Sequence, residues 1–141
     1  MATLSSPVIL DTAIFVDYLR NGRHEDRIGS LTGVVRTSSV VLAELWRGAS
    51  RPSELAYLRT LEKNHSILVP TKQNWLASGE LLGQVRVDRG FTPEKLRNLH
   101  FDVLIALTAR SHGARLITSD RADFDLIASY KAAKGLNLEI W

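Results

Sequence analysis

Four acidic residues lie at the ends of apolar runs or inside them: Asp11, Glu44, Asp102 and Asp120. A buried carboxylate without a partner costs several kcal/mol or becomes neutral, so each such group needs a cation. If the four converge, they repel one another unless a multivalent cation is present. Hard oxygen ligands suit Mg²⁺ or Mn²⁺. The chemistry predicted for these residues is therefore a divalent metal site, with phosphate completing the coordination shell.

Each acid also has an ordinary structural explanation. Asp11 and Asp120 each precede an expected helix, so either could be an N-cap. Glu44 and Asp102 could instead pair with an arginine or lie at the exposed edge of an amphipathic helix. Arg47 and Arg36 are candidates for such a pair. Three further acids are expected to be solvated and to have no role: Asp17, Asp26 and Asp88.

Short apolar runs alternate with helical patterns along the chain. Strands are expected at Val8–Leu10, Val34–Thr37, Ile67–Val69, Arg115–Thr118 and, at an edge, Leu136–Ile140. Helices are expected after Asp11 up to Asn21, from Ser38 or Ser39 to Gly48, from Pro52, over 71–87, from His100 to His112 and over 122–128. Residues 23–33 are expected to form a short helix or loop, and Thr92–Glu94 a single helical turn before a polar stretch.

This alternation predicts an α/β fold with three layers, α/β/α, around a central, mostly parallel sheet of four to five strands. The strand at residues 8–10 would be central, flanked by those at 34–37 and 115–118. All four acids could then reach one cleft at the carboxyl end of the sheet, where such folds bind ligands.

The composition indicates one domain over residues 1–141, with 45% apolar residues and no cysteine. No run approaches the ~18 apolar residues of a membrane span, and no signal peptide is evident, so a cytoplasmic protein without a membrane partner is expected. The net charge is +3. With four acids in one site, 18 basic residues face 11 other acids, which leaves +7. That charge is either a solvated surface or an attraction for RNA or DNA.

Four segments together resemble a PIN domain, in particular the VapC class of toxin ribonucleases from bacterial and archaeal toxin–antitoxin pairs. The segments are Val8–Thr12, Ser39–Gly48, Phe101–Ala106 and Leu116–Phe124, in the family's order. The resemblance implies a Mg²⁺-dependent endoribonuclease that inhibits translation, binds an antitoxin and forms a homodimer. The segment from Arg86 to Leu99 is longer and more basic than in compact members.

The resemblance also implies residue roles. Asp11, Glu44, Asp102 and Asp120 would be the catalytic acids, and Asp11 and Asp102 the primary ligands of Mg²⁺ or Mn²⁺. Supporting positions would be Thr12, Thr118, Ser119 and the auxiliary acid Asp123. Glu44 and Asp120 would hold a second metal or orient the water that hydrolyses the RNA phosphodiester. The four histidines are scattered and form no catalytic pair.

Other functions remain open from sequence. A phosphate-transfer domain of the receiver or haloacid dehalogenase type would share the fold, but the latter needs a second Asp two residues after Asp11, where this chain has Ala13. A second alternative is a nucleic-acid or partner-binding module without catalytic activity. Such a module would not need all four acidic residues, and their presence argues against it. Four apolar residues could form a groove for a partner or be core: Trp46, Leu55, Leu58 and Leu61. The RNA target depends on groove shape and loop contacts.

Overall fold

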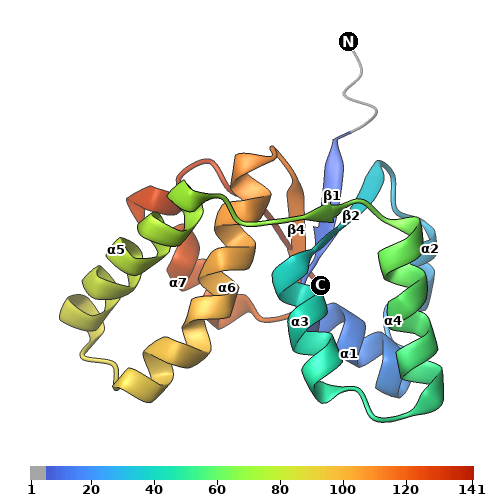
Figure 1. Cartoon of the computed structure of the whole chain (residues 1–141). Helices are drawn as coiled ribbons and strands as arrows, with labels where there is room; N and C mark the ends of the chain where they lie inside the picture. The colour runs from blue at the N-terminus through green and yellow to red at the C-terminus, as the bar shows by residue number, and fades with distance from the viewer. Residues whose placement is uncertain (1–5) are drawn as a thin grey trace.

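A computed structural model describes residues 6–141 and contains a five-stranded sheet in the order β3-β2-β1-β4-β5, with every pairing parallel. The strands are β1 (Pro7–Leu10), β2 (Val34–Ser38), β3 (Ile67–Leu68), β4 (Arg115–Thr118) and β5 (Asn137–Ile140). β1 lies between β2 and β4 (Figure 1), with Ile9 paired to Arg36 on one side and to Leu116 on the other. The central position predicted for β1 is confirmed.

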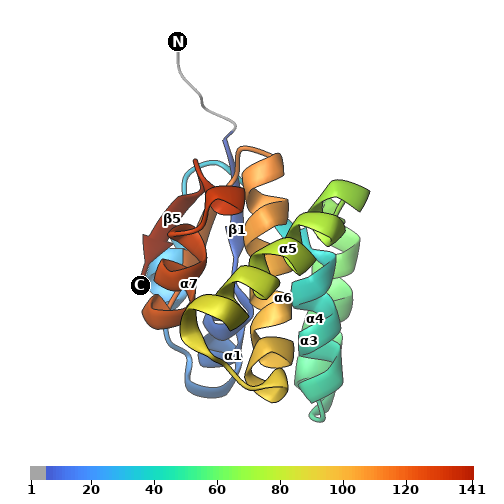
Figure 2. The ribbon, with the colours of Figure 1, turned by 90° about the vertical axis from the view of Figure 1, so that its left-hand side faces the viewer.

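Seven α-helices are present among the described residues. They are α1 (Thr12–Asn21), α2 (Glu25–Gly29), α3 (Ser39–Gly48), α4 (Pro52–Asn64), α5 (Lys72–Arg89), α6 (Pro93–Ser111) and α7 (Arg121–Ala128), followed by a 3₁₀ turn, η1 (Lys131–Ala133). In Figure 2, α3, α4 and α6 lie on one side of β1 and α7 lies on the other, while α5 runs obliquely across the front of the view. The three-layer α/β/α prediction is therefore confirmed.

The core forms where β1 is covered on both faces. Val8, Ile9 and Leu10 are almost fully buried, as expected for a central parallel strand. On α6, every residue from Val103 to Ala109 is buried. Leu58 and Leu61 of α4 are also buried, so they belong to the core and not to a partner groove. No helix among the described residues is both long and apolar enough to cross a membrane.

The start of α6 differs from the sequence expectation. A helix was expected from His100, preceded by one turn, but α6 is continuous from Pro93. Thr92 caps it by accepting a hydrogen bond from the Lys95 backbone N–H at 3.2 Å, and Pro93 occupies the first turn, where proline is tolerated. The polar residues hid the pattern, because only Leu96 and Leu99 of this first part face the core.

The chain has little space where β1 and β2 begin. Gly33 precedes β2 with φ +97°, and a Cβ there would lie 2.5 Å from the Ser6 carbonyl oxygen. We expect Gly33→Ala to lower the free energy of unfolding by more than about 1 kcal/mol, because both the backbone conformation and the contact oppose a side chain. Urea denaturation measures this.

Gly29 provides the matched control, since it ends α2 and a Cβ there meets nothing within 4 Å. Gly29→Ala should be neutral or stabilising. Equal stability changes in the two variants would contradict the tight approach at Gly33.

Candidate metal centre

The carboxyl ends of β1 and β4 bring the first two acids together. The strands are in register, with Leu10 opposite Ile117, and the Asp11 backbone N–H donates to the Ile117 carbonyl at 2.8 Å. Asp11 therefore leaves β1 beside the point where Thr118 ends β4, two residues before Asp120. This is the sheet edge that the strand order predicts as a ligand site.

Asp11 is 3% exposed, and only one of its carboxylate oxygens is hydrogen-bonded. Thr118 Oγ1 donates to Asp11 Oδ2 at 2.7 Å, while buried Oδ1 has no hydrogen-bond partner. Burial raises the pKa of Asp11 to about 6, and the Thr118 hydroxyl opposes that rise. Asp11 occupies the N-cap position of α1, but its side chain makes no capping hydrogen bond. The backbone N–H groups of Thr12 and Ala13 also lower the pKa of Asp11, so the start of α1 accounts for this carboxylate in part, and its free Oδ1 suits a cation.

Glu44 reaches the site from α3 and is held by a neighbour of Asp11. Thr12 Oγ1 donates to Glu44 Oε1 at 2.7 Å. Arg47 lies 3.9 Å from the other oxygen, but its side chain is 70% exposed, so this pair contributes little. The described ion pairs include none from Arg36 to Glu44 or Asp102. The arginine alternative therefore accounts only weakly for Glu44.

Asp102 lies at the centre of the acidic cluster. One oxygen each from Asp102, Asp120 and Asp123 lies within 4.8 Å of the others. The pKa of Asp102 is raised to about 8, first by burial and then by repulsion from Asp11, Glu44, Asp123 and Asp120, in that order. The structure thus brings together the four acids singled out in the sequence and adds Asp123, which the resemblance placed as auxiliary.

Asp120 has two roles. Its Oδ1 accepts from the Asp123 backbone N–H at 3.2 Å, so the predicted helix cap exists. Burial is the largest contribution raising the pKa of Asp120, and repulsion from Asp123 adds to it. A carboxylate has two oxygens, so capping α7 does not prevent Asp120 from contributing to the cluster.

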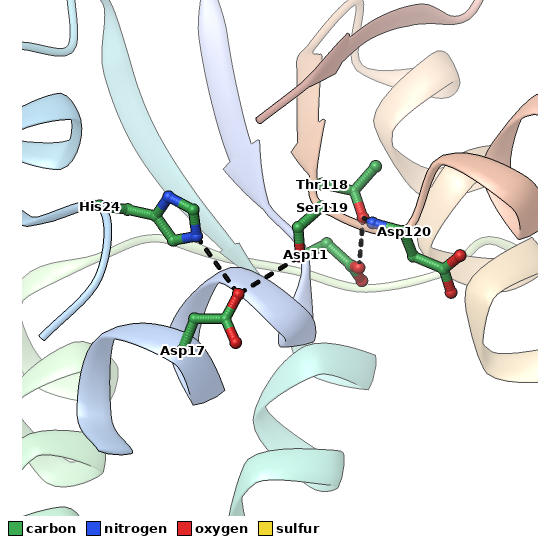
Figure 3. A network of polar contacts seen from close by, with 6 residues as sticks. All are labelled: Asp11, Asp17, His24, Thr118, Ser119 and Asp120. Atoms are coloured by element: carbon green, nitrogen blue, oxygen red, sulfur yellow. Dashed lines mark hydrogen bonds and ion pairs between the residues drawn. The ribbon is translucent and has the colours of Figure 1, made fainter. Parts of the chain in front are cut away.

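Thr118 links two of the acids (Figure 3). Its hydroxyl donates to Asp11 and accepts from the Asp120 backbone N–H at 3.0 Å. The hydroxyl of the next residue, Ser119, donates to Asp17 Oδ2 at 3.5 Å. The same Asp17 oxygen lies 3.2 Å from His24 Nε2. The expectation that Asp17 is simply solvated was wrong, because it ties α1 to the turn that carries Asp120.

Lys95 is a candidate functional residue that the sequence interpretation missed. Its Nζ lies 3.3 Å from Asp123 Oδ1. The residue fell in the stretch expected to be polar and irregular. Had the Thr92–Glu94 signal been extended into a helix, Lys95 and Asp102 would have been seen seven residues apart, on one helix face.

The residues present fit a divalent cation. Five carboxylates gather, and among residues 6–141 the cations paired to members of the group are Lys95 and the exposed Arg47. A buried oxygen of Asp11 lacks a partner, and the pKa values of Asp11 and Asp102 are both raised. Such a cluster is relieved by a hard cation that prefers oxygen ligands, as Mg²⁺ and Mn²⁺ do.

The chain matches the family model of the PIN domain over residues 8–129, so it belongs to the PIN-domain family. This match covers most of the chain and contains all five acids of the cluster. A comparison with curated proteins gave no match.

Several solved structures share the fold. DNA-bound VapBC from Salmonella typhimurium is 23% identical, with a TM-score of 0.70 over 97% of this chain and 98% of that one. VapBC2 from Rickettsia felis, bound to a promoter DNA fragment, is 21% identical, with a TM-score of 0.69 over 96% and 98%. VapBC-5, a toxin–antitoxin system member from Mycobacterium tuberculosis, is 23% identical, with a TM-score of 0.58 over 96% and 97%. At these identities the likeness shows the fold.

The raised pKa of Asp102 makes the stability of the metal-free protein pH-dependent. Between the ordinary value of 3.8 and about 8, the folded protein keeps a proton on Asp102 that the unfolded chain has lost. Stability therefore falls as the pH rises through this window. We expect Asp102→Asn to exceed the wild type in unfolding free energy by at least about 1 kcal/mol at pH 8 in EDTA. The difference should vanish near pH 4, and a constant difference across thermal melts at both pH values would contradict the account.

The Thr118 hydroxyl is expected to matter to the site more than an ordinary buried hydroxyl does. Thr118→Val keeps the shape but removes the donor to Asp11 and the acceptor for Asp120. We expect any activity of the site to fall about 10- to 100-fold, as when a group supporting a metal ligand is lost. The control is Thr108→Val, since the buried Thr108 hydroxyl bonds only to the Leu104 carbonyl within α6. Equal activity losses would show that Thr118 has no special role.

Proposed function

We propose that this protein is a Mg²⁺- or Mn²⁺-dependent endoribonuclease that hydrolyses RNA phosphodiester bonds. Membership in the PIN-domain family supports nuclease character. The observation that carries the proposal is the convergence of four carboxylates around that of Asp102, whose pKa is raised to about 8 by burial first and then by repulsion from them. A protein with only a structural use for these residues has no reason to keep them so close at such an electrostatic cost.

Asp11 and Asp102 are the proposed primary ligands, with Asp120 and Asp123 next to them. When bound, the cation supplies Lewis-acid stabilisation of the phosphate and lowers the pKa of a water molecule. The oxygens closest together belong to Asp102, Asp120 and Asp123, and the free Oδ1 of Asp11 adds a further donor.

The chain's own residues orient the reaction. Thr12 donates to the Glu44 carboxylate and Thr118 to that of Asp11, so these two carboxylates are held before substrate binds, while the Thr118 hydroxyl also fixes the backbone N–H of Asp120. Glu44 or Asp120 would accept a hydrogen bond from the attacking water. Lys95, beside Asp123, would attract the negative charge that develops on the phosphate. In-line attack by water gives a 5′-phosphate and a 3′-hydroxyl and does not need the 2′-hydroxyl of RNA.

We further propose that the protein is the toxin of a toxin–antitoxin pair and inhibits translation by cutting RNA in the cytoplasm. The solved structures with the same fold include toxin–antitoxin complexes, which supports an antitoxin partner. A homodimer is part of the same proposal. A formal charge of +3, with five acids gathered in one cluster, leaves an excess of positive charge elsewhere to attract RNA.

Single substitutions of the proposed ligands test the activity. We expect Asp11→Asn and Asp102→Asn each to lower metal-dependent cleavage of a structured RNA by at least about 100-fold, because each removes a ligand rather than a supporting group. Circular dichroism should show an intact fold. Asp26→Asn is the control, since Asp26 is exposed on α2.

Metal removal completes the test. Cleavage should stop in EDTA and return with Mg²⁺ or Mn²⁺. Full activity in EDTA would overturn the metal-dependent mechanism, whereas RNA binding with no cleavage under any condition would favour a non-catalytic binding module.

A further inference from the structure

A groove beside the acidic cluster shares Lys95 and Asp123 with it and extends beyond it to residues without a role in the proposed hydrolysis. It has a volume of about 420 Å³ and lies between the α5–α6 turn and α7. Its charged, hydroxyl-bearing and aromatic lining residues are Arg89, Phe91, Lys95, Asp123, Asp125 and Ser129. Lys95 and Asp123 also belong to the edge of the acidic cluster, so the groove continues directly from the candidate metal centre.

The walls of this groove are fixed by specific contacts. The Tyr130 hydroxyl donates to Asp88 Oδ2 at 2.8 Å and so ties the end of α5 to the segment after α7. Gly90, with φ +63°, ends α5, and Thr92 caps α6 two residues later. Phe91 lies between these two signals and packs partly against the core. The aromatic ring is therefore held in place before any ligand arrives.

The chemistry of the groove suits a nucleotide. Phe91 offers an aromatic surface, and Lys95 Nζ lies 5.7 Å from its ring centroid. Arg89 and Lys95 supply positive charge for phosphate groups, while Asp125 and Ser129 supply acceptors for a base or sugar. Proteins that bind single-stranded nucleic acid combine these elements, stacking bases on aromatic side chains and tracking the backbone with cations.

We propose that the base of a nucleotide adjacent to the scissile phosphate stacks on Phe91 in this groove. This inference rests on the proposed ribonuclease activity. A phosphate next to Lys95 and Asp123 places the neighbouring nucleotide at the groove. A base paired in a helix cannot present its face to a side chain, so the substrate is single-stranded at this position.

The test uses full-length protein carrying Asp11→Asn, so that RNA binding is read without cleavage. A short, fluorescently labelled, single-stranded RNA is compared with versions in which one base at a time is removed to leave an abasic sugar. In the parent, affinity should fall about tenfold at one abasic position, matching loss of one base–aromatic stack. Adding Phe91→Leu to this parent should lower the affinity for the intact RNA by a similar factor. Removal of the base at that position should then have no further effect on affinity. Phe91→Tyr should retain both.

Trp75→Leu is the matched control, because Trp75 is an exposed aromatic residue at the opposite end of α5. It should leave the abasic profile unchanged. The proposal is overturned if the parent shows no sensitive position, or if Phe91→Leu keeps the parental profile. Failure of the proposed nuclease is seen separately, as absent metal-dependent cleavage by the wild type. Should Phe91→Leu misfold, Phe91→Met serves as the non-aromatic variant with the same expected losses, and a parental profile in folded Phe91→Met would overturn the proposal.

Discussion

Five carboxylates, that of Asp11 buried and the others partly buried, crowd together at the carboxyl end of β1, and the fold has to hold them there. Without a cation, burial and then repulsion raise the pKa of Asp102 to about 8, and burial raises that of Asp11 to about 6. Only a rigid frame keeps such groups together. The buried strand Val8–Leu10, paired on both sides, supplies that frame, and the hydroxyls of Thr12 and Thr118 fix two of the acids within it.

The acids come from four different elements, with Asp120 and Asp123 both at the start of α7, so the cluster exists only when the fold is complete. Asp11 follows β1, Glu44 lies on α3, Asp102 on α6 and Asp120 at the start of α7. The buried run on α6 holds Asp102 against the sheet, and the core thus positions the site. Repulsion among the carboxylates lowers the stability of the metal-free protein. A protein can tolerate this cost when binding of a cation and a substrate offsets it. In the neighbouring groove, Phe91 is likewise held against the core before any ligand binds.

Much of this could be predicted from the sequence because the signals are local. The short apolar run that ends in an acid predicted Asp11 at the carboxyl end of a strand. The alternation of strands and helices predicted a parallel sheet with β1 at its centre. What could not be predicted depends on contacts between distant residues. Asp17 meets Ser119, which is 102 residues away, and no pattern along α1 indicates this contact. Lys95 was missed for another reason: polar residues masked the first turns of α6, although the cap at Thr92 was visible.

If a cation binds at the acidic cluster, it must displace the proton held by Asp102. Calorimetric titration of Mn²⁺ into the metal-free protein, in buffers of different ionisation enthalpy, counts the protons released. If the cluster binds the cation through Asp102, about one proton should leave at about pH 7, and the number should fall towards zero at about pH 9. No Mn²⁺ binding by the folded protein, or binding without proton release at neutral pH, would contradict the account.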